Sequence, residues 1–390
     1  MISTNAPAVL NNCLSAPLAL YIHWPFCVSK CPYCDFNSHV RETVDQVAWK
    51  EALLADLAYE ATQMPGRTLG SIFFGGGTPS LMPPDTVAAL IEAATRHWRA
   101  AENIEITLEA NPSSVEAARF ADLALAGVNR SSLGLQALDD EALHFLGRAH
   151  DVDEGLAALN VAQRNFARVS FDLIYARPGQ AADTWATELE RALGFGTEHL
   201  SLYQLTIEPG TRFATLVQQG KLTPIDNDTA ADFFETTRAT MARRGLPAYE
   251  ISNHARRGAE SRHNLTYWRG RDYVGIGPGA HGRRLGMATV RHKKPENWIA
   301  AVARNAHGTQ SETPLSGAER ATEALLMGLR LSEGVDLAHV RKYSGVNQPV
   351  KIDAVARLQA IGLLALDHDR LTISERGFLL LDSILPEIVA

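Results

Sequence analysis

The sequence predicts an α/β fold built on a parallel β-sheet. From residue 18 to about residue 206, short apolar runs alternate with longer amphipathic stretches, and six such runs follow one another. Strands that alternate with helices of this length form βαβ units, in which the strands run parallel. Six units are too few for a closed eight-stranded barrel, so an open or partial barrel and a doubly wound sheet both fit the pattern.

The predicted strands are the short apolar runs, because strands of a parallel sheet are buried on both faces. They are LALYIHW (Leu18–Trp24), SIFF (Ser71–Phe74), IEITLEA (Ile104–Ala110), RSSLGLQ (Arg130–Gln136), VSFDLIYA (Val169–Ala176) and HLSLYQLT (His199–Thr206). The segments between them have the spacing of amphipathic helices. They are Thr43–Thr62, Asp85–Trp98, Val115–Ala126, Asp153–Asn165 and Ala182–Leu193.

The pattern changes after about residue 207. Residues 245–285 are rich in Gly, Pro and Arg and contain GRDYVGIGPGAHG (Gly270–Gly282), a spacing that favours turns and short strands over helices. From about residue 316 we expect a helix (Gly317–Leu331), a second helix, a third helix (Lys351–Ile361) and two short strands around LLALDHDRLTI (Leu363–Ile373). This order is typical of a winged-helix-like module. Its polar positions carry mixed charge, so we interpret it as structural or substrate-covering rather than DNA-binding.

These shifts divide the chain into four predicted parts. We expect a flexible leader over residues 1–17 and a barrel domain over residues 18–245. A Gly/Arg-rich extension over residues 246–310 contains HNLTYW and GIGPGAH, and a C-terminal α+β module covers residues 311–390.

Composition and charge exclude several classes of protein. The chain has 390 residues, with 37 Lys and Arg against 44 Asp and Glu, which gives a formal net charge of −7. Nucleic-acid binders carry a basic field, so we expect no nucleic-acid partner. No run of about 18 apolar residues exists, which predicts no membrane span and leaves only peripheral membrane contact open. Residues 1–17 lack the basic start and apolar core of a signal peptide, so we expect a cytoplasmic protein.

Three of the four cysteines lie within eight residues, in the segment directly after the first predicted strand. They are Cys27, Cys31 and Cys34, while Cys13 lies in the leader. Thiolates at this spacing can converge on one inorganic cluster from a single loop, and Cys thiolates are the usual ligands of iron–sulfur clusters. Three ligands for four irons leave one iron with an open coordination position, as at a catalytic zinc site.

Three other interpretations of these cysteines stay open. A Cys₃His zinc site could use His23 or His39, although the chain has no second CxxC pair. CPYC (Cys31–Cys34) is also typical of a glutaredoxin active site, but that leaves the upstream cysteine unexplained. Chance burial of unrelated cysteines is the third. We favour the iron–sulfur cluster over all of these.

Polar residues also stand at the carboxyl ends of the other predicted strands, where parallel barrels place their functional groups. GGGTPS (Gly75–Ser80) follows the second strand, and successive glycines let the backbone approach a ligand closely. The other strand ends carry Glu109, Gln136 and Asp172, with Arg148 in the GRAH segment (Gly147–His150). Each alone could be a solvated or capping group, and the Gly-rich segment could be an ordinary turn. Their common position favours a binding site.

The cysteine motif resembles that of the radical S-adenosylmethionine (SAM) superfamily, in which CxxxCxxC follows the first strand and an aromatic residue, here Tyr33, precedes the third cysteine. The resemblance implies a partial (β/α)6 barrel and a four-iron four-sulfur cluster held by the three cysteines. It also implies that SAM chelates the open iron and is cleaved to methionine and a 5′-deoxyadenosyl radical. The residues that it assigns to SAM are Tyr21, Tyr33, Gly76, Gly77, Thr78, Glu109, Gln136, Arg148 and Asp172.

Further segments resemble one branch of this superfamily, which holds the oxygen-independent coproporphyrinogen III oxidases and the haem chaperones. They are GVNRSSLGLQALDDEALHFLGRAH (Gly127–His150), DLIYARPGQ (Asp172–Gln180), YEISNHA (Tyr249–Ala255), HNLTYW (His263–Trp268) and GIGPGAH (Gly275–His281). The resemblance implies either a carrier that delivers haem to acceptor proteins, such as respiratory enzymes, or an enzyme that decarboxylates porphyrinogen propionates. The oxidases have a fourth cysteine where this chain has Phe36, and a longer extension than the 26 residues before Cys27. Both differences favour the carrier, and we assign no catalytic residue.

HNLTYW is the candidate haem contact, through His263, Asn264, Tyr267 and Trp268. His and Tyr are both haem-iron ligands, and His281 is a possible second nitrogen donor. The alternative is that the aromatic residues pack in the core and His263 is merely hydrogen-bonded. The chain departs from the branch at Ala176–Arg177 and at His254; Arg177 could pair with a haem propionate or lie on a solvated loop.

Overall fold

The fold is an α/β structure with one central sheet, seen in a computed structural model that describes residues 16–390. The sheet has eleven strands in the order β13-β12-β11-β10-β1-β4-β5-β6-β7-β8-β9. Its six central parallel strands correspond to the six predicted apolar runs and confirm the α/β prediction. They are β1 (Leu18–Trp24), β4 (Thr68–Gly76), β5 (Arg99–Ala110), β6 (Arg130–Gln136), β7 (Arg168–Tyr175) and β8 (His199–Gln204).

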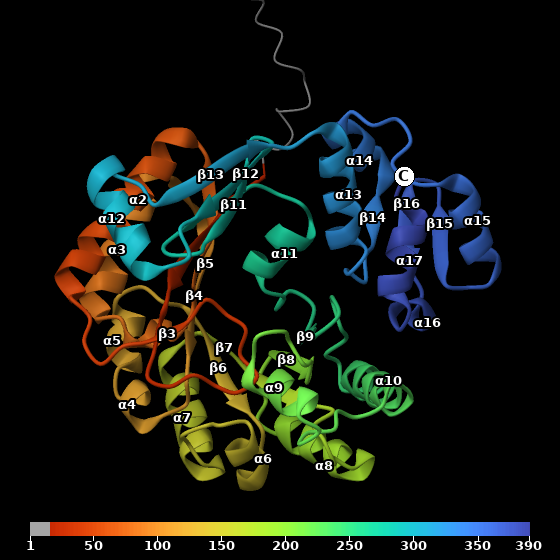
Figure 1. The fold of residues 1–390 in the computed structure, drawn as a ribbon, viewed down its shortest axis with the longest axis horizontal. Coiled ribbons are helices and arrows are strands. Elements are labelled where there is room, and N and C mark those ends of the chain that lie inside the picture. Colours follow the sequence, from red (N-terminus) through yellow and green to blue (C-terminus); the bar gives the residue numbers. More distant parts are fainter. Residues whose placement is uncertain (1–15) are drawn as a thin grey trace, which may run out of the picture.

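Helices connect these strands and cover the outer face of the sheet (Figure 1). Four predicted helices are present, as α2 (Gln46–Gln63), α3 (Pro84–His97), α7 (Val152–Asn165) and α8 (Ala182–Leu193). The single helix predicted over residues 115–126 is instead two short helices, α4 (Ser114–Ala117) and α5 (Phe120–Leu125). The short helix α4 is held by Glu116, whose carboxylate accepts hydrogen bonds from Ser80 and from the Asn111 amide. Helix α6 (Asp140–Phe145) follows β6. Helices α9 (Arg212–Gln218) and α10 (Asn227–Arg243) follow β8.

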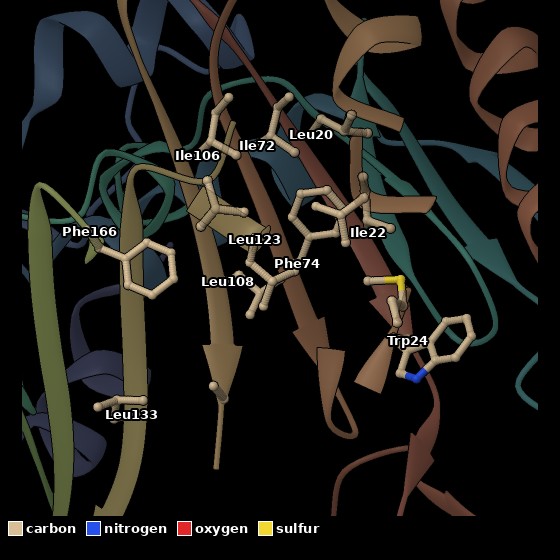
Figure 2. Packing of buried hydrophobic residues seen from close by; sticks show 14 of the residues in the cluster. Leu20, Ile22, Trp24, Ile72, Phe74, Ile106, Leu108, Leu123, Leu133 and Phe166 are labelled. Carbon is tan, nitrogen blue, oxygen red and sulfur yellow. The ribbon is translucent and has the colours of Figure 1, made fainter. Parts of the chain in front are cut away.

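Alternation along the strands separates an apolar outer face from a polar inner face. Residues i and i+2 of a strand lie on the same face. Leu20, Ile22, Ile72, Phe74 and Leu108 therefore point together toward the helices, as Figure 2 shows, and are all buried. The intervening positions point into the barrel. The period-2 pattern thus places the polar residues of different strands in one interior.

The Gly/Pro/Arg-rich region continues the sheet at both edges. Strand β10 (Tyr273–Ile276) pairs in parallel with β1, and β11 (His281–Arg284), β12 (Met287–Arg291) and β13 (Thr309–Pro314) extend that edge in antiparallel fashion. At the opposite edge β9 (Asn253–Ala255) pairs with β8. The predicted short strands are confirmed. The expectation of turns and short strands rather than helices over residues 245–285 was wrong for α11 (Arg262–Trp268), which begins with a Ser261 side-chain cap. Helix α12 (Pro295–Asn305) follows that region.

A buried ion network fastens this added edge to α2. Arg291 is fully buried and donates to both Asp56 and Glu60, and Arg284 donates to Glu60 at 3.0 Å. Asp56 also accepts from the amide of Gly277 at 3.2 Å. Because unpaired buried charges are costly, these bonds fix the position of β10–β12 against the helix layer.

The C-terminal module has its own apolar core and the predicted order of helices and strands. Its elements are α13 (Gly317–Gly328), β14 (Val335–Asp336), α14 (Leu337–Ser344), α15 (Ile352–Ala360), β15 (Leu364–Asp367), β16 (Arg370–Ile373), α16 (Glu375–Phe378) and α17 (Leu381–Ile388). Helix α11 lies between this module and the barrel sheet (Figure 1). The exact division of the chain into four parts stays a prediction.

Within residues 16–390, no helix is both long enough and apolar enough to cross a membrane.

Candidate cluster and cofactor site

The three cysteines lie in the loop that follows β1. This loop is closed by a short parallel pair, β2 (Phe26–Cys27) with β3 (His39–Val40). Cys27, Cys31 and Cys34 are half-buried free thiols. They are near enough for the charges of Cys31 and Cys34 to contribute to the raised pKa of Cys27, although burial is the larger cause. Cys13 lies outside the described residues.

Arg148 connects the cysteine loop to the strand ends. Its guanidinium donates to the Cys31 sulfur at 3.3 Å, to the Asn111 side-chain oxygen at 2.6 Å and to the Gly134 carbonyl at 3.0 Å. Tyr33 is close to both Arg148 and Cys31, and burial raises its pKa. The Arg148 side chain thus links the cysteine loop to the end of β5 and to β6. The sequence predicted that functional residues from these segments would lie together.

The glycine-rich segment lies against the base of the same loop. The amides of Gly77 and Thr78 donate to the Trp24 and Phe26 carbonyls, at 2.7 and 2.8 Å. Gly76 has φ +115°, and a Cβ there would lie 2.6 Å from the His23 ring. Only glycine therefore fits at this position, because the His23 ring occupies the space of a side chain.

Two carboxyl groups, Glu109 and Asp172, point into the barrel from β5 and β7. Burial raises the pKa of Glu109 to about 8, helped by the charge of Asp172, while the Gly76 amide lowers it by donating at 3.3 Å. Burial likewise raises the pKa of Asp172 to about 6, and Ser132 donates to it at 3.4 Å. Acidic groups with raised pKa values at one barrel mouth are typical of a binding or catalytic site.

Gln136 ends β6 in a left-handed conformation, with φ +70°. Non-glycine residues rarely adopt this region, and such residues often lie at functional sites or in turns. Of the nine residues predicted to bind SAM, most follow or end a strand or lie in the cysteine loop, whereas Tyr21 and Asp172 lie within β1 and β7 and Arg148 lies between α6 and α7. Their assignment to SAM stays a prediction.

A second chain of contacts runs from the cysteine loop to α11. The Tyr21 hydroxyl lies 3.0 Å from His23 Nδ1, and His23 Nε2 lies 2.9 Å from the Asn37 carbonyl oxygen. On the other side, the ring of Tyr21 lies 6.3 Å from Phe73, which stacks on His263 at 4.7 Å. The candidate haem segment is therefore packed against the inner face of β1 and β4, away from the carboxyl ends of these strands.

His263 is buried inside this packing. Its Nε2 lies 2.7 Å from the Tyr267 hydroxyl and its Nδ1 lies 3.4 Å from Ser71 Oγ. Burial lowers its pKa to about 3, so the ring is neutral at physiological pH. Both nitrogens already have partners in this conformation. Asn264 contacts Tyr249, whereas Trp268 lies on the other side of the helix.

Three residues that were left open at the sequence level have defined surroundings. Arg177 is buried and paired with Glu188 at 2.7 Å, so it is neither on a solvated loop nor directed at a ligand. His254 is also buried, which lowers its pKa to about 3. His281 lies on β11, close enough to His23 to lower the pKa of that residue, and not beside α11.

The sequence reasoning missed Asn111 and His23 as parts of the site. Asn111 accepts from Arg148 and donates to Thr78 at 3.1 Å, which joins the cation to the glycine-rich segment. Its place two residues after Glu109 was the available signal. His23 and His39 were considered only as zinc ligands, yet both are hydrogen-bonded to Asn37.

The cysteine loop, the strand ends and the glycine-rich segment together define an α/β-barrel protein with a cluster and cofactor site at the carboxyl ends of its strands. A family model described as the radical SAM superfamily matches residues 21–192, and one described as the HemN C-terminal domain matches residues 315–380. The heme chaperone HemW of Escherichia coli is 36% identical over 387 residues, covering 96% of this chain and 98% of the relative. The HemW of Mycobacterium tuberculosis is 35% identical, covering 95% and 94%.

The chain therefore belongs to the radical SAM superfamily and, within it, to the HemN/HemW branch. A bovine relative named radical S-adenosyl methionine domain-containing protein 1, mitochondrial, is 41% identical over 391 residues, covering 95% of this chain and 87% of the relative. The solved structure of coproporphyrinogen III oxidase (HemN) from Escherichia coli superposes with a TM-score of 0.79, covering 97% of this chain and 92% of that one. At 22% identity it shows the fold alone.

Membership of the superfamily implies a four-iron four-sulfur cluster and SAM. The residues present fit both groups. Three free thiols share one loop, and the carboxyl groups of Glu109 and Asp172 offer hydrogen-bond acceptors inside the barrel. Among residues 16–390 no three His, Cys, Asp or Glu side chains converge as they would around a single ion. A cluster that has its own sulfur and iron core separates its protein ligands more widely.

Proposed function

We propose that this protein is a haem chaperone, which binds haem, a four-iron four-sulfur cluster and SAM, and transfers haem to acceptor proteins. The observation that carries this proposal is the three-cysteine loop. Phe36 stands two positions after the third cysteine with its side chain 60% exposed, where the oxidases have a further thiol. The relatives named heme chaperone HemW match nearly their whole length, which supports the same function.

In this proposal Cys27, Cys31 and Cys34 hold the cluster. The cluster would supply one electron to bound SAM. The chain's own residues would position SAM: the segment Gly76–Thr78 would bind the SAM amino group, and Glu109 would accept from the ribose hydroxyls. The remaining SAM contacts come from Gln136, Arg148 and Asp172, with Tyr21 and Tyr33 as walls.

Haem binding is assigned to the HNLTYW segment of α11. The ring of His263 lies 6.0 Å from that of Tyr21, one of the residues assigned to SAM, which supports a haem site near the SAM site. We propose a cytoplasmic location and acceptors among haem-containing proteins such as respiratory enzymes. The bovine relative carries a mitochondrial name, so the location of this chain requires its own measurement.

The test uses protein whose cluster is reconstituted anaerobically, mixed with SAM, a one-electron reductant and coproporphyrinogen III. We expect no protoporphyrinogen, together with one-to-one haem binding and haem transfer to an apo-acceptor. Coupled formation of 5′-deoxyadenosine and protoporphyrinogen would identify a decarboxylating oxidase instead. If the protein does not bind haem at all, the proposal that it is a haem carrier would be wrong.

A further inference from the structure

A cavity of about 220 Å³ lies at the amino ends of β6, β7 and β8, at the opposite end of these strands from the cysteine loop. It is smaller than the usual pocket for an organic cofactor, so it suits a small ligand. Arg130, Arg168 and His199 are the first residues of the three strands. The polar residues that line the cavity are Arg130, Gln163, Arg168, Thr197, Glu198 and His199.

Two arginines of this cavity share one carboxylate. Arg130 is buried and donates to Glu105 at 2.9 Å, and the Arg168 guanidinium lies 3.5 Å from the same carboxylate. Glu105 also accepts from the backbone amides of Arg262 and His263, at 2.8 and 3.4 Å. After burial, the charge of Arg130 is the main cause of the lowered pKa of Arg168, so the two cations lie close together. One carboxylate therefore compensates them only in part.

Two further polar side chains of the cavity wall have a buried atom without a hydrogen-bond partner. Within residues 16–390, Thr197 Oγ1 and His199 Nδ1 have none, and both residues are more than nine-tenths buried. The other ring nitrogen of His199, Nε2, lies 3.0 Å from the Tyr249 hydroxyl. When this hydroxyl donates to Nε2, the ring proton is on Nδ1. Because buried donors without partners are costly, a ligand that accepts hydrogen bonds would be stabilised here.

Glu198 is the one acidic side chain among the residues that line the cavity. It is exposed, and its charge affects the pKa of Arg168 less than the charge of Glu105 does. Glu105 itself is buried and already accepts from Arg130 and from two backbone amides. The buried part of the cavity thus offers donors and positive charge, which favours a small anion with several acceptor oxygens.

We propose that this cavity binds a small oxyanion, such as inorganic phosphate, through Arg130, Arg168, Thr197 and His199. The guanidinium groups supply charge-assisted hydrogen bonds, and the Thr197 hydroxyl and the His199 ring supply neutral donors. The site is separate from the cluster and SAM residues and does not depend on the proposed function. Because Glu105 binds both arginines and the first amides of α11, the anion and the start of this helix share the same two cations.

The experiment is an anaerobic calorimetric titration of the full chain, with its cluster reconstituted, with phosphate at constant ionic strength. We expect one phosphate per chain and a higher Tm in phosphate than in chloride. Arg168→Gln should bind at least about tenfold more weakly, because a charge-assisted hydrogen bond is lost. Thr197→Val keeps the side-chain shape and should bind about two- to tenfold more weakly. Glu198→Gln should bind about threefold or more tightly, because it removes a like charge beside the anion.

Matched variants separate the possible outcomes. Arg96→Gln changes an arginine on α3 whose side chain is 68% exposed, and it should bind phosphate like the wild type. If Arg168→Gln does not fold, opposite changes of affinity in Thr197→Val and Glu198→Gln still support the site, because general destabilisation cannot strengthen binding. Wild-type affinity in both Arg168→Gln and Thr197→Val would show that phosphate binds elsewhere. Equal Tm values in phosphate and chloride, without heat of binding, would overturn the proposal.

Discussion

The guanidinium of Arg148 donates a hydrogen bond of 3.3 Å to the sulfur of Cys31, one of the three cysteines in the loop after β1. The same group reaches Asn111 and the Gly134 carbonyl, so a single side chain contacts the loop and two strand ends. Hydrogen bonds and positive charge near cluster sulfurs stabilise the reduced cluster and raise its potential.

Arg148→Met should therefore make the cluster harder to reduce. We expect a more negative midpoint potential and SAM cleavage about 10- to 100-fold slower, since supporting residues of metal ligands have effects of this size. Redox titration followed by electron paramagnetic resonance measures the potential. Arg164→Met is the control, because Arg164 is exposed on α7 and bonds only to its own helix. An unchanged potential in Arg148→Met would contradict the assignment.

Each of Cys27→Ala, Cys31→Ala and Cys34→Ala should lose the cluster, because two thiolates cannot hold it stably. The expected result is loss of most of the bound iron and of the broad visible absorbance after anaerobic reconstitution. Cys13→Ala should bind iron like the wild type. Full iron content in any one of the three loop variants would remove that cysteine from the ligand set.

In the protein without bound SAM, Glu109 should make the free energy of unfolding depend on pH. Its pKa in the folded chain is raised to about 8, so the folded state holds the proton more tightly than the unfolded state. Stability should then fall as pH rises from about 4.5 to about 8, the interval between the two pKa values.

Glu109→Gln should remove that part of the pH dependence and be more stable than the wild type at pH 8. It should also bind SAM more weakly, because an amide replaces a hydrogen-bond acceptor and its charge. Thermal unfolding against pH, with and without SAM, measures both effects. A variant with the same pH slope as the wild type would show that Glu109 titrates normally.

Arg177→Met should destabilise the fold by about 3–5 kcal/mol, because it leaves the buried Glu188 without its partner. Denaturant unfolding measures the loss. The exposed pair Arg244–Glu190 offers the comparison, and Arg244→Met should cost about 1 kcal/mol or less. Haem affinity should not change in folded Arg177→Met protein; a specific loss of affinity would make Arg177 a ligand contact after all.

Local patterns were enough to predict the six central strands and the shared position of Glu109 and Asp172. Both follow from the period of two along a strand and from the common direction of parallel strands. The cysteine loop could be predicted as well, because its ligands are close in sequence and their spacing has few structural uses.

Partners that are distant in sequence could not be predicted in this way. The bond from Arg148 to Asn111 and the pair between Arg177 and Glu188 depend on how segments meet in space. The orientation of His263 could not be predicted either. The glycine-rich sequence around it shows no helical spacing of apolar residues, so helix α11 was not expected. The pairing of β10 with β1 joins strands separated by most of the barrel.

That pairing has a consequence for biosynthesis. Strand β1 ends at Trp24, yet its neighbour on one side is β10, which begins at Tyr273 and is synthesised much later. At about 5–20 residues per second, the ribosome needs roughly 10–50 s to make the intervening chain. During that interval one edge of β1 has no strand to pair with, and Gly277 has not yet packed on His23 at the base of the cysteine loop. The cysteine loop therefore acquires its complete support only after β10 and Gly277 have been synthesised, so we expect stable insertion of iron and sulfur to follow that step.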